Sequence, residues 1–353
     1  MEEYVEGVHL RRTREKDREI DGLASLVGGR VGLGAFLDDL NRRGREVRAQ
    51  PFWPPGRAVH RAFTWDLADR RTTQWWPQGI STSADASDTG KVEGRRLLAV
   101  AWYAKDVGRG NPGSRVTLVD RATLRYRHVL LVVPHLAADG TPGVQPLRIH
   151  AGGLAWCGDH LHVAATGRGF MSLRLDDLMR VPDGRVSMYG YRYVLPVRFA
   201  YQSVAEKGHQ KLRYSFLSLD RTASPPQLVA GEYTSAARGS RRLIHFPLDP
   251  ESLLPRADGD GISRPVRLEE RGVAHAQGVV VADGRYYVSM SRGRYRPGSV
   301  HVGRPGAFRE FRAATPIGPE DLSWWPSTGE LWSVTEHPWR RWVFSMKRDW
   351  FDR

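Results

Sequence analysis

Several features that would narrow the functional class are missing from this sequence of 353 residues. The one cysteine, Cys157, excludes an internal disulfide and any metal cluster held by several thiolates. No apolar run approaches the ~18 residues that a membrane-spanning helix requires. The opening residues, MEEYVEGVHLRRTREKDREIDG, are charged and lack the apolar core of a signal peptide, so we expect a cytoplasmic protein without a membrane partner.

Lysine is also scarce, although the formal net charge is +14. Of the 53 basic residues only six are lysine, and the other 47 are arginines distributed along the whole chain. Nucleic-acid-binding proteins usually gather their positive charge in one patch or stripe, so we expect no nucleic-acid partner. The sequence likewise has no phosphate-binding loop, no dinucleotide fingerprint and no serine nucleophile elbow.

The first 56 residues differ from the rest of the chain in the spacing of their apolar residues. The stretches REKDREIDGLASLVGG and LGAFLDDLNRRGREVR have apolar residues at helical spacing. Pro54 and Pro55 then prevent a helix from continuing. We therefore predict a short helical N-terminal extension over residues 1–56, dispensable for folding, and a second domain over residues 57–353.

The second domain has short alternating runs separated by Gly, Pro and Asp turns, which is typical of an all-β fold. Four pieces resemble one another: WWPQGISTS from Trp75, HAGGLAW from His150, HAQGVVVADGRYYVS from His275 and GPEDLSWWPSTGELWSV from Gly318. A weaker fifth unit fits between the second and third. We predict a β-propeller with five blades of four antiparallel strands, in which a strand within 59–67 completes the last blade. The alternative is a β-sandwich with extra strands.

The same pieces resemble a family of mostly secreted actinobacterial proteins. The resemblance spans roughly residues 60–348 and is carried by the PQGI, HAGG and GPEDL motifs. Members of that family are similar to propellers of the strictosidine-synthase-like and gluconolactonase-like group. The resemblance implies the fold, and it implies no activity that can be transferred. His275 and His337 depart from the family pattern, which favours a specialised function.

The polar residues ahead of the innermost strands form the candidate site. In a propeller these strands all start at the same face and point at the central axis, so residues just ahead of them converge. The residues expected there are Gln78, His150, Gln277, Glu320 and Asp321. An axial cavity lined by polar groups favours a ligand pocket. The alternative is that these groups only bond one another and water within the channel.

The loops between second and third strands should reach the same face and form a rim. The rim residues expected to bind substrate or assist catalysis are Trp102, Tyr103, Arg168, Arg292, Glu336 and His337. His275, which begins the third repeated piece, is also expected to bind substrate. Arginine forks suit carboxylate or phosphate groups. Each arginine could equally be a solvated surface charge.

The expected chemistry is acid–base catalysis on a small molecule. His150 would serve as general base or acid, with Glu320 or Asp321 as its partner. Tyr103 and His337 would donate hydrogen bonds to a developing oxyanion. We therefore predict an enzyme of the lyase, isomerase or cyclase type in specialised metabolism, or a lactonase-like hydrolase.

Two other interpretations stay open at this stage. The chain could be a non-catalytic propeller that binds a glycan or another ligand on its tryptophans, or a scaffold for protein partners. A metal is a further possibility, because one His, two Gln and two carboxylates offer oxygen-rich ligation. Such a set suits Mg²⁺ or Ca²⁺ better than zinc, although the spacing is not diagnostic.

Overall fold

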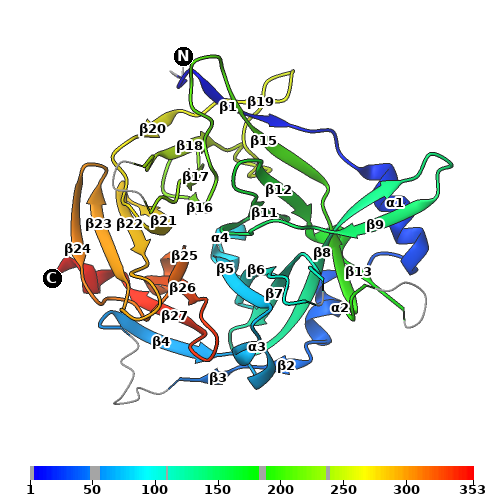
Figure 1. The fold of residues 1–353 in the computed structure, drawn as a ribbon, viewed down its shortest axis with the longest axis horizontal. Coiled ribbons are helices and arrows are strands. Elements are labelled where there is room, and N and C mark those ends of the chain that lie inside the picture. The colour runs from blue at the N-terminus through cyan, green and yellow to red at the C-terminus, as the bar shows by residue number, and fades with distance from the viewer. Residues whose placement is uncertain (1–3, 48–55, 109, 183–187, 236–238) are drawn as a thin grey trace.

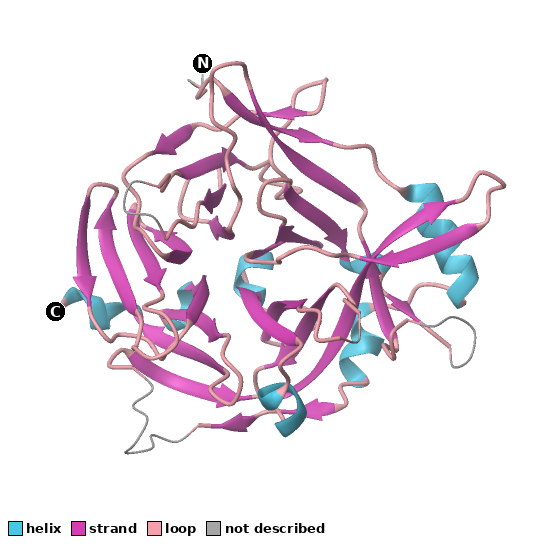
Figure 2. Cartoon of the chain, in the orientation of Figure 1, coloured by secondary structure: helices cyan, strands magenta, loops and turns pink. Residues whose placement is uncertain are grey.

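The computed structural model of the chain describes residues 4–47, 56–108, 110–182, 188–235 and 239–353. It is 47% strand and 11% helix, and its sheets have a β-propeller arrangement in which four blades are detected. The sheets are distributed around a centre, and most helices lie on the outside of the ring (Figures 1 and 2). The all-β class and the propeller are thus confirmed, whereas a count of five blades stays a prediction.

The strands fall into five hydrogen-bonded sheets, of which two are large. The first contains β5 (Trp75–Thr82), β6 (Leu97–Ala104), β7 (Ser114–Asp120), β8 (Arg125–Leu136), β14 (Tyr193–Pro196) and β13 (Met179–Arg180), with β2 (Arg42–Arg43) and β9 (Pro142–Pro146) also paired to β8. The second contains β10 (Leu154–Cys157), β11 (His160–Ala164), β12 (Gly169–Arg174), β15 (Phe199–Ala205), β1 (Val8–Arg12) and β19 (Ile262–Ser263).

The other three sheets are smaller. The third contains β16 (Phe216–Asp220), β17 (Gln227–Gly231), β18 (Leu243–Pro247) and β20 (Arg267–Glu269). The fourth contains β21 (Ala276–Ala282), β22 (Arg285–Met290), β23 (Ser299–Arg304) and β24 (Ala307–Phe311). The fifth contains β25 (Pro319–Trp325), β26 (Glu330–Thr335), β27 (Trp342–Lys347), β4 (Val59–Thr64) and β3 (Arg45–Glu46).

Strand β4 completes the fifth sheet from the other end of the chain. It runs antiparallel to β27, with Thr64 opposite Trp342 and Phe63 opposite Val343. In Figure 1 the blue strand β4 lies beside the red strand β27. The expectation that a strand within 59–67 completes the last sheet is confirmed.

Helices occupy few positions. They are α1 (Asp17–Val27), α2 (Leu33–Asp38), α3 (Leu67–Arg71) and α4 (Ser83–Ala86), with short 3₁₀ turns at η1 (Leu175–Asp177), η2 (Pro326–Thr328) and η3 (Arg348–Asp352). Helix α1 is amphipathic, and its fully buried Ile20 and Leu23 belong to the core that also holds Trp102. It ends at Gly28, whose φ of 95° suits glycine and whose N–H bonds the Ala24 carbonyl.

The segment before residue 57 is both helical and part of the sheets. It contains α1 and α2 as the spacing predicts, but β1 pairs with β15 on one side and with β19 on the other. In addition, β2 pairs with β8 and β3 pairs with β4. The domain boundary at residue 56 stays a prediction. Residues 48–55, which end the N-terminal segment, lie outside the described part of the chain.

Glycines let the inner strands approach one another at the centre. A Cβ atom on Gly79 would lie 2.7 Å from the carbonyl carbon of Gly153, and one on Gly278 would lie 2.5 Å from the Cα of Asp321. The inner strands contact one another in the cyclic order β5, β10, β16, β21, β25 and back to β5. Strands β5, β21 and β25 each carry a register shift near their start, which releases backbone groups from regular pairing there.

Candidate functional site

The candidate site lies where β5 and β25 begin. Gln78 belongs to β5, Glu320 to β25, and Glu336 directly follows β26. The amide Nε2 of Gln78 donates a hydrogen bond of 3.2 Å to Glu336 Oε2. Three residues separated by up to 258 positions therefore meet at one end of the axis, as the propeller prediction requires. We call this group, with Tyr103, the carboxyl cluster.

Glu320 is a buried carboxyl group without a protein partner. It is only 2% exposed. Among the residues that the structure describes, no group donates a hydrogen bond to its side chain. Burial, followed by the nearby charges of Glu336 and Asp321, raises the pKa of Glu320 well above its usual range. This carboxyl group is consequently protonated where ordinary glutamates are ionised.

Glu336 differs from Glu320 in the charges around it. Burial raises the pKa of Glu336 above its usual value, and Lys105, the hydrogen bond from Gln78, and the charges of Arg341 and Arg294 reduce that rise without reversing it. Its side chain is 21% exposed, so it remains in contact with solvent. The two glutamates thus differ in their charged neighbours, because cations lie near Glu336, whereas the charged groups that shift the pKa of Glu320 are carboxylates.

Asp321 does not share the surroundings of Glu320, although the two are adjacent in sequence. Its Oδ2 accepts hydrogen bonds from the backbone N–H groups of Leu154 at 3.0 Å and Ile80 at 3.3 Å. The carboxyl group thereby ties β25 to β10 and β5 at the centre. Its Oδ1 is buried without a partner in the described part of the chain, and burial raises its pKa well above the usual range.

Tyr103 connects the glutamates to His150. Its ring lies 4.5 Å from the imidazole of His150, and burial together with Glu336 and Glu320 raises the pKa of its phenol. His150 is solvent-exposed, while desolvation by neighbouring protein and the charge of Lys105 lower its pKa. The imidazole is consequently neutral at pH 7. The structure therefore places His150 at the outer edge of the carboxyl cluster.

His337 lies beside the same cluster. Its Nδ1 is 3.5 Å from Glu336 Oε1, and its ring packs edge-on against Trp76 at 6.1 Å between centroids. Burial, then Arg340 and Arg294, lowers the pKa of His337 to about 4. Both ring nitrogens are enclosed by the protein and have no hydrogen-bond partner among the described residues.

The other predicted rim residues are placed differently. Trp102 is fully buried with the Arg115 guanidinium 4.5 Å from its ring, so it is a core residue and does not reach the rim. Arg292 is engaged by Ser299 and Glu310. Arg168 is exposed at a turn. The sequence alone could not separate these cases, because tryptophan and arginine serve core and rim equally well.

Two further predicted residues, Gln277 and His275, lie near the third and fourth sheets. Gln277 is half-buried in β21. His275 has a φ of 58°, and its ring is 6.2 Å from that of Tyr233. The pKa of Tyr233 is raised by burial and by Glu320 and Glu336, so this tyrosine also faces the glutamates.

Sequence reasoning did not identify Arg341, which holds the Glu336 backbone in place. It is fully buried, donates from Nε to the Glu336 carbonyl and from Nη1 to the Asp69 carbonyl, and lies 5.5 Å from the ring of Trp76. In a chain with 47 arginines, no local pattern distinguishes this one.

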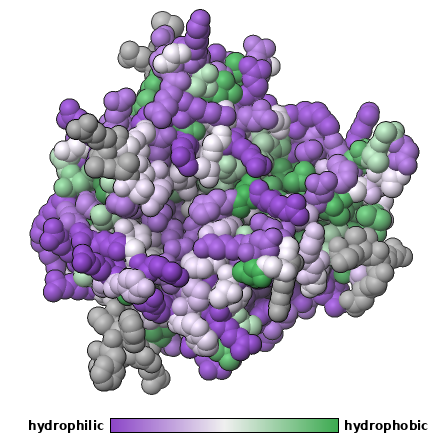
Figure 3. Space-filling view, in the orientation of Figure 1, coloured by the Kyte–Doolittle hydropathy of each residue, from purple (hydrophilic) through white to green (hydrophobic). Residues whose placement is uncertain are grey.

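No group of three or more His, Cys, Asp or Glu is placed to hold a metal ion among the described residues. Mg²⁺ or Ca²⁺ therefore stays a sequence-based prediction. The described residues also include no helix long and apolar enough to cross a membrane. The face shown in Figure 3 is mostly hydrophilic, with apolar atoms in separate patches.

Comparison with known proteins gives distant structural likenesses only. No protein family and no curated protein matches the sequence. Among solved structures, a gluconolactonase from Xanthomonas campestris is 16% identical over 88% of this chain and 85% of its own, with a TM-score of 0.36. A GH43_1 enzyme from Xanthomonas citri is 13% identical over 79% and 91%, with a TM-score of 0.39. A glucose dehydrogenase is 15% identical over 71% and 78%, with a TM-score of 0.35.

Proposed function

We propose that this protein is an enzyme that moves protons on a small polar molecule at the carboxyl cluster. Glu320 is the general acid and Glu336 the general base. The observation that carries the proposal is the Glu320 carboxyl group, which is buried yet has no protein hydrogen-bond partner in the described part of the chain. Buried polar groups are nearly always bonded, so an exception at the start of an inner strand indicates a group kept for a ligand.

The division of roles follows from the surroundings of the two glutamates. When two carboxyl groups lie close together and their environments push their pKa values apart, one holds the proton and the other accepts one. Burial keeps Glu320 protonated, whereas Lys105, Arg341 and the Gln78 hydrogen bond favour the ionised form of Glu336. General acid–base catalysis of this kind contributes about 10²–10⁴-fold in rate.

Neighbouring groups would bind and orient the substrate. The Tyr103 hydroxyl stays protonated and can donate to an oxygen that gains charge, as can the neutral imidazole of His337. His150 at the outer edge can relay a proton to solvent. These roles fit the lyase, isomerase or cyclase reactions expected from the sequence, and Glu336 could equally activate a water for lactone hydrolysis.

The contacts between inner strands bear on the number of blades. Five sheets each contribute one inner strand, and these strands contact one another in a closed cycle. We infer that the ring has five blades, with Glu320, Gln78 and Gln277 on three of the inner strands.

A second candidate function is ligand binding without catalysis at the same opening. Trp339 and Tyr295 are 57% and 84% exposed, and both follow strands whose loops lead to the cluster. Exposed aromatic rings of this kind can stack on a ligand.

The acid–base assignment can be tested without knowing the substrate. Side-chain carboxyl carbons labelled with ¹³C on glutamate would be titrated by NMR in the wild type, Glu320→Gln and Glu336→Gln. We expect the signal missing from Glu320→Gln to titrate well above the signal missing from Glu336→Gln. Two glutamates that titrate together near the ordinary value would contradict the proposal.

A second measurement separates catalysis from binding. Small lactones, keto acids and hydroxy acids would be incubated with the protein in D₂O and followed by proton NMR. An acid–base enzyme introduces deuterium or forms product, and Glu320→Gln abolishes this. A binding propeller would show saturation transfer to the ligand with no exchange, and Glu320→Gln would leave that signal in place.

A further inference from the structure

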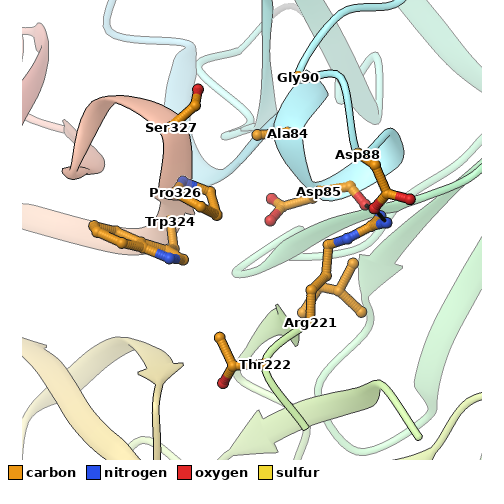
Figure 4. A pocket seen from close by; sticks show the side chains of 10 residues that line it. Ala84, Asp85, Asp88, Gly90, Arg221, Thr222, Trp324, Pro326 and Ser327 are labelled. Atoms are coloured by element: carbon orange, nitrogen blue, oxygen red, sulfur yellow. Dashed lines mark hydrogen bonds and ion pairs between the residues drawn. The ribbon is translucent and has the colours of Figure 1, made fainter. Parts of the chain in front are cut away.

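A second cavity opens at the other end of the axis. It has a volume of about 480 Å³ and is lined by Asp85, Arg221, Thr222, Trp324, Pro326 and Ser327, among others (Figure 4). Trp324 follows Glu320 by four residues on β25, which at ~3.3 Å per residue separates the two by about 13 Å. This cavity is therefore distinct from the carboxyl cluster, and the inference below does not rest on the function proposed for that cluster.

Asp85 provides a fixed polar group in this cavity. Its Oδ2 accepts three hydrogen bonds, from Ser81 Oγ at 2.6 Å, Ser323 Oγ at 2.7 Å and Thr82 N at 3.2 Å. All of them go to one oxygen, so Oδ1 has no donor among the described residues while the side chain lines the cavity. Figure 4 shows the carboxyl group pointing toward Trp324 and Pro326. A buried carboxyl clamped on one oxygen presents the other in a fixed direction.

Trp324 lies across the cavity from Asp85, with the nitrogen end of its indole on the cavity side (Figure 4). It is 9% exposed, and it lies with Pro326 on the side of the cavity facing Asp85 and Arg221 (Figure 4). An indole face carries negative charge density and attracts the weakly positive C–H groups of a flat ligand face. The two walls thus offer complementary contacts, one apolar and one polar.

The charged side chains that line the cavity are two carboxyl groups, Asp85 and Asp88, and one guanidinium, Arg221. Arg221 pairs with Asp88 and donates at 2.7 Å to the Asp85 carbonyl. An anionic ligand would meet the Asp85 and Asp88 carboxyl groups, and a cationic ligand would meet the Arg221 guanidinium. An anionic ligand is therefore disfavoured, and because the one guanidinium is already paired with Asp88, the cavity suits an uncharged molecule rich in hydrogen-bonding groups.

We propose that this cavity is a binding site for a neutral polyhydroxylated ligand of the size of a sugar ring. One C–H face of the ring lies on Trp324, and a hydroxyl group donates a hydrogen bond to Asp85 Oδ1. The volume falls within the range of about 300–1,000 Å³ that small-molecule sites occupy. Burial, opposed by the bonds from Ser81 and Ser323, raises the pKa of Asp85 to about 6. The Oδ1 atom accordingly accepts from a hydroxyl at pH 7 to 8.

The test uses the full chain labelled with 5-fluorotryptophan and titrated with the methyl glycosides of glucose, galactose, mannose and xylose. The fluorine signal of Trp324 is identified as the one absent from Trp324→Phe. We expect at least one neutral glycoside to shift that signal in a saturable way at millimolar concentration. The charged comparators glucosamine and glucuronate should bind more weakly.

Variants then locate the contact by ligand-observed NMR. Asp85→Ala and Trp324→Leu should each weaken binding at least tenfold, while Asp349→Ala, at an exposed position, and Glu320→Gln, at the other opening, should leave it unchanged. Asp85 also accepts hydrogen bonds from Ser81 and Ser323, so thermal melting is used to check that Asp85→Ala is folded. If that variant is unfolded, the result for Trp324→Leu decides the test. Absence of any saturable shift, tighter binding of a charged comparator, or unchanged affinity in Trp324→Leu would overturn the proposal.

Discussion

Two buried carboxyl groups in this protein, Asp69 and Glu320, are almost equally removed from solvent, at 4% and 2% exposure. Asp69 accepts hydrogen bonds from Arg115 at 2.9 Å, His128 Nε2 at 2.8 Å and the Tyr126 hydroxyl at 2.8 Å. Glu320 accepts none from the described residues. Burial alone would raise the pKa of Asp69, but His128, Arg115 and Arg42 together bring it well below its usual range. The pKa of Glu320 moves the other way.

The difference shows that burial alone does not determine the pKa or the role of a carboxyl group. A buried carboxylate surrounded by donors is a structural tie, because its bonds are already used within the protein. A buried carboxyl without donors holds its proton and keeps its hydrogen-bonding capacity for something else. Asp321, adjacent to Glu320, combines the two cases. Its Oδ2 ties three inner strands together, while its Oδ1 has no partner among the described residues and its pKa is raised by burial.

The largest expected effect is a loss of folding stability when Asp69 is replaced. Asp69→Asn leaves the Arg115 guanidinium buried without its counter-charge, which should cost about 3–5 kcal/mol of folding free energy. Guanidinium denaturation would measure it. The control Asp176→Asn removes a carboxylate that is 67% exposed and should change stability by less than ~0.5 kcal/mol. Equal losses in the two variants would remove the basis of the comparison.

The next effect concerns Asp321. Asp321→Ala removes the acceptor of two buried backbone N–H groups, and stranding them should cost about 2–4 kcal/mol. Asp321→Asn keeps one acceptor oxygen and should recover most of that loss, as denaturant melts of the pair would show. If the alanine variant were as stable as wild type, Asp321 would not tie the inner strands.

The pH dependence of Glu320 gives a smaller effect of opposite sign. The folded-state pKa lies above the unfolded value of about 4.3, so the stability that the protonated form provides is complete below that pH and is lost as pH rises toward the folded pKa. Glu320→Gln removes this loss, so its stability relative to wild type should rise by up to about 1.4 kcal/mol per pH unit across that window. Thermal melts at pH 4 to 8 measure the difference. A variant that becomes relatively less stable with rising pH would reverse the assignment.

The smallest effect is expected at His150. The side chain is exposed and rests on Tyr103, so His150→Ala should change the free energy of unfolding by no more than ~0.5 kcal/mol. If the proposed relay is correct, the same variant slows deuterium exchange into a substrate found with the D₂O panel. A stability loss of several kcal/mol without any effect on exchange would make His150 a structural residue.

The placement of the site could be predicted from sequence because it depends on repetition. Pieces such as WWPQGISTS and GPEDLSWW align the starts of inner strands, and this is enough to bring Gln78 and Glu320 to one end of the axis. The pairing of Glu320 with Glu336 could not be predicted, since Glu336 arrives from the end of β26 and its environment depends on Lys105 and Arg341. The different roles of Glu320 and Asp321 depend on a local register shift in β25 that leaves no sequence signal.

The segment before residue 57 shows the limit of periodicity. Its helices can be predicted from sequence because α1 has three turns of apolar residues at helical spacing. Strand β1, in contrast, is only five residues long and buries only Val8 and Leu10. Two apolar residues among charges are too few to predict a strand, yet β1 pairs on both edges. Removing residues 1–56 would expose both neighbours, so the packing does not favour the expectation that this segment is dispensable.

The pairing of β4 with β27 has a consequence for how the molecule is made. The Thr64 hydroxyl donates a hydrogen bond to the carbonyl of Arg341, 277 residues away, so this sheet cannot form until β27 has been synthesised. Contacts between residues so distant in sequence slow folding, because a long loop must close before they stabilise the chain. On the ribosome, β4 emerges long before β27 and waits with an unpaired edge, and such edges make a nascent chain prone to aggregate.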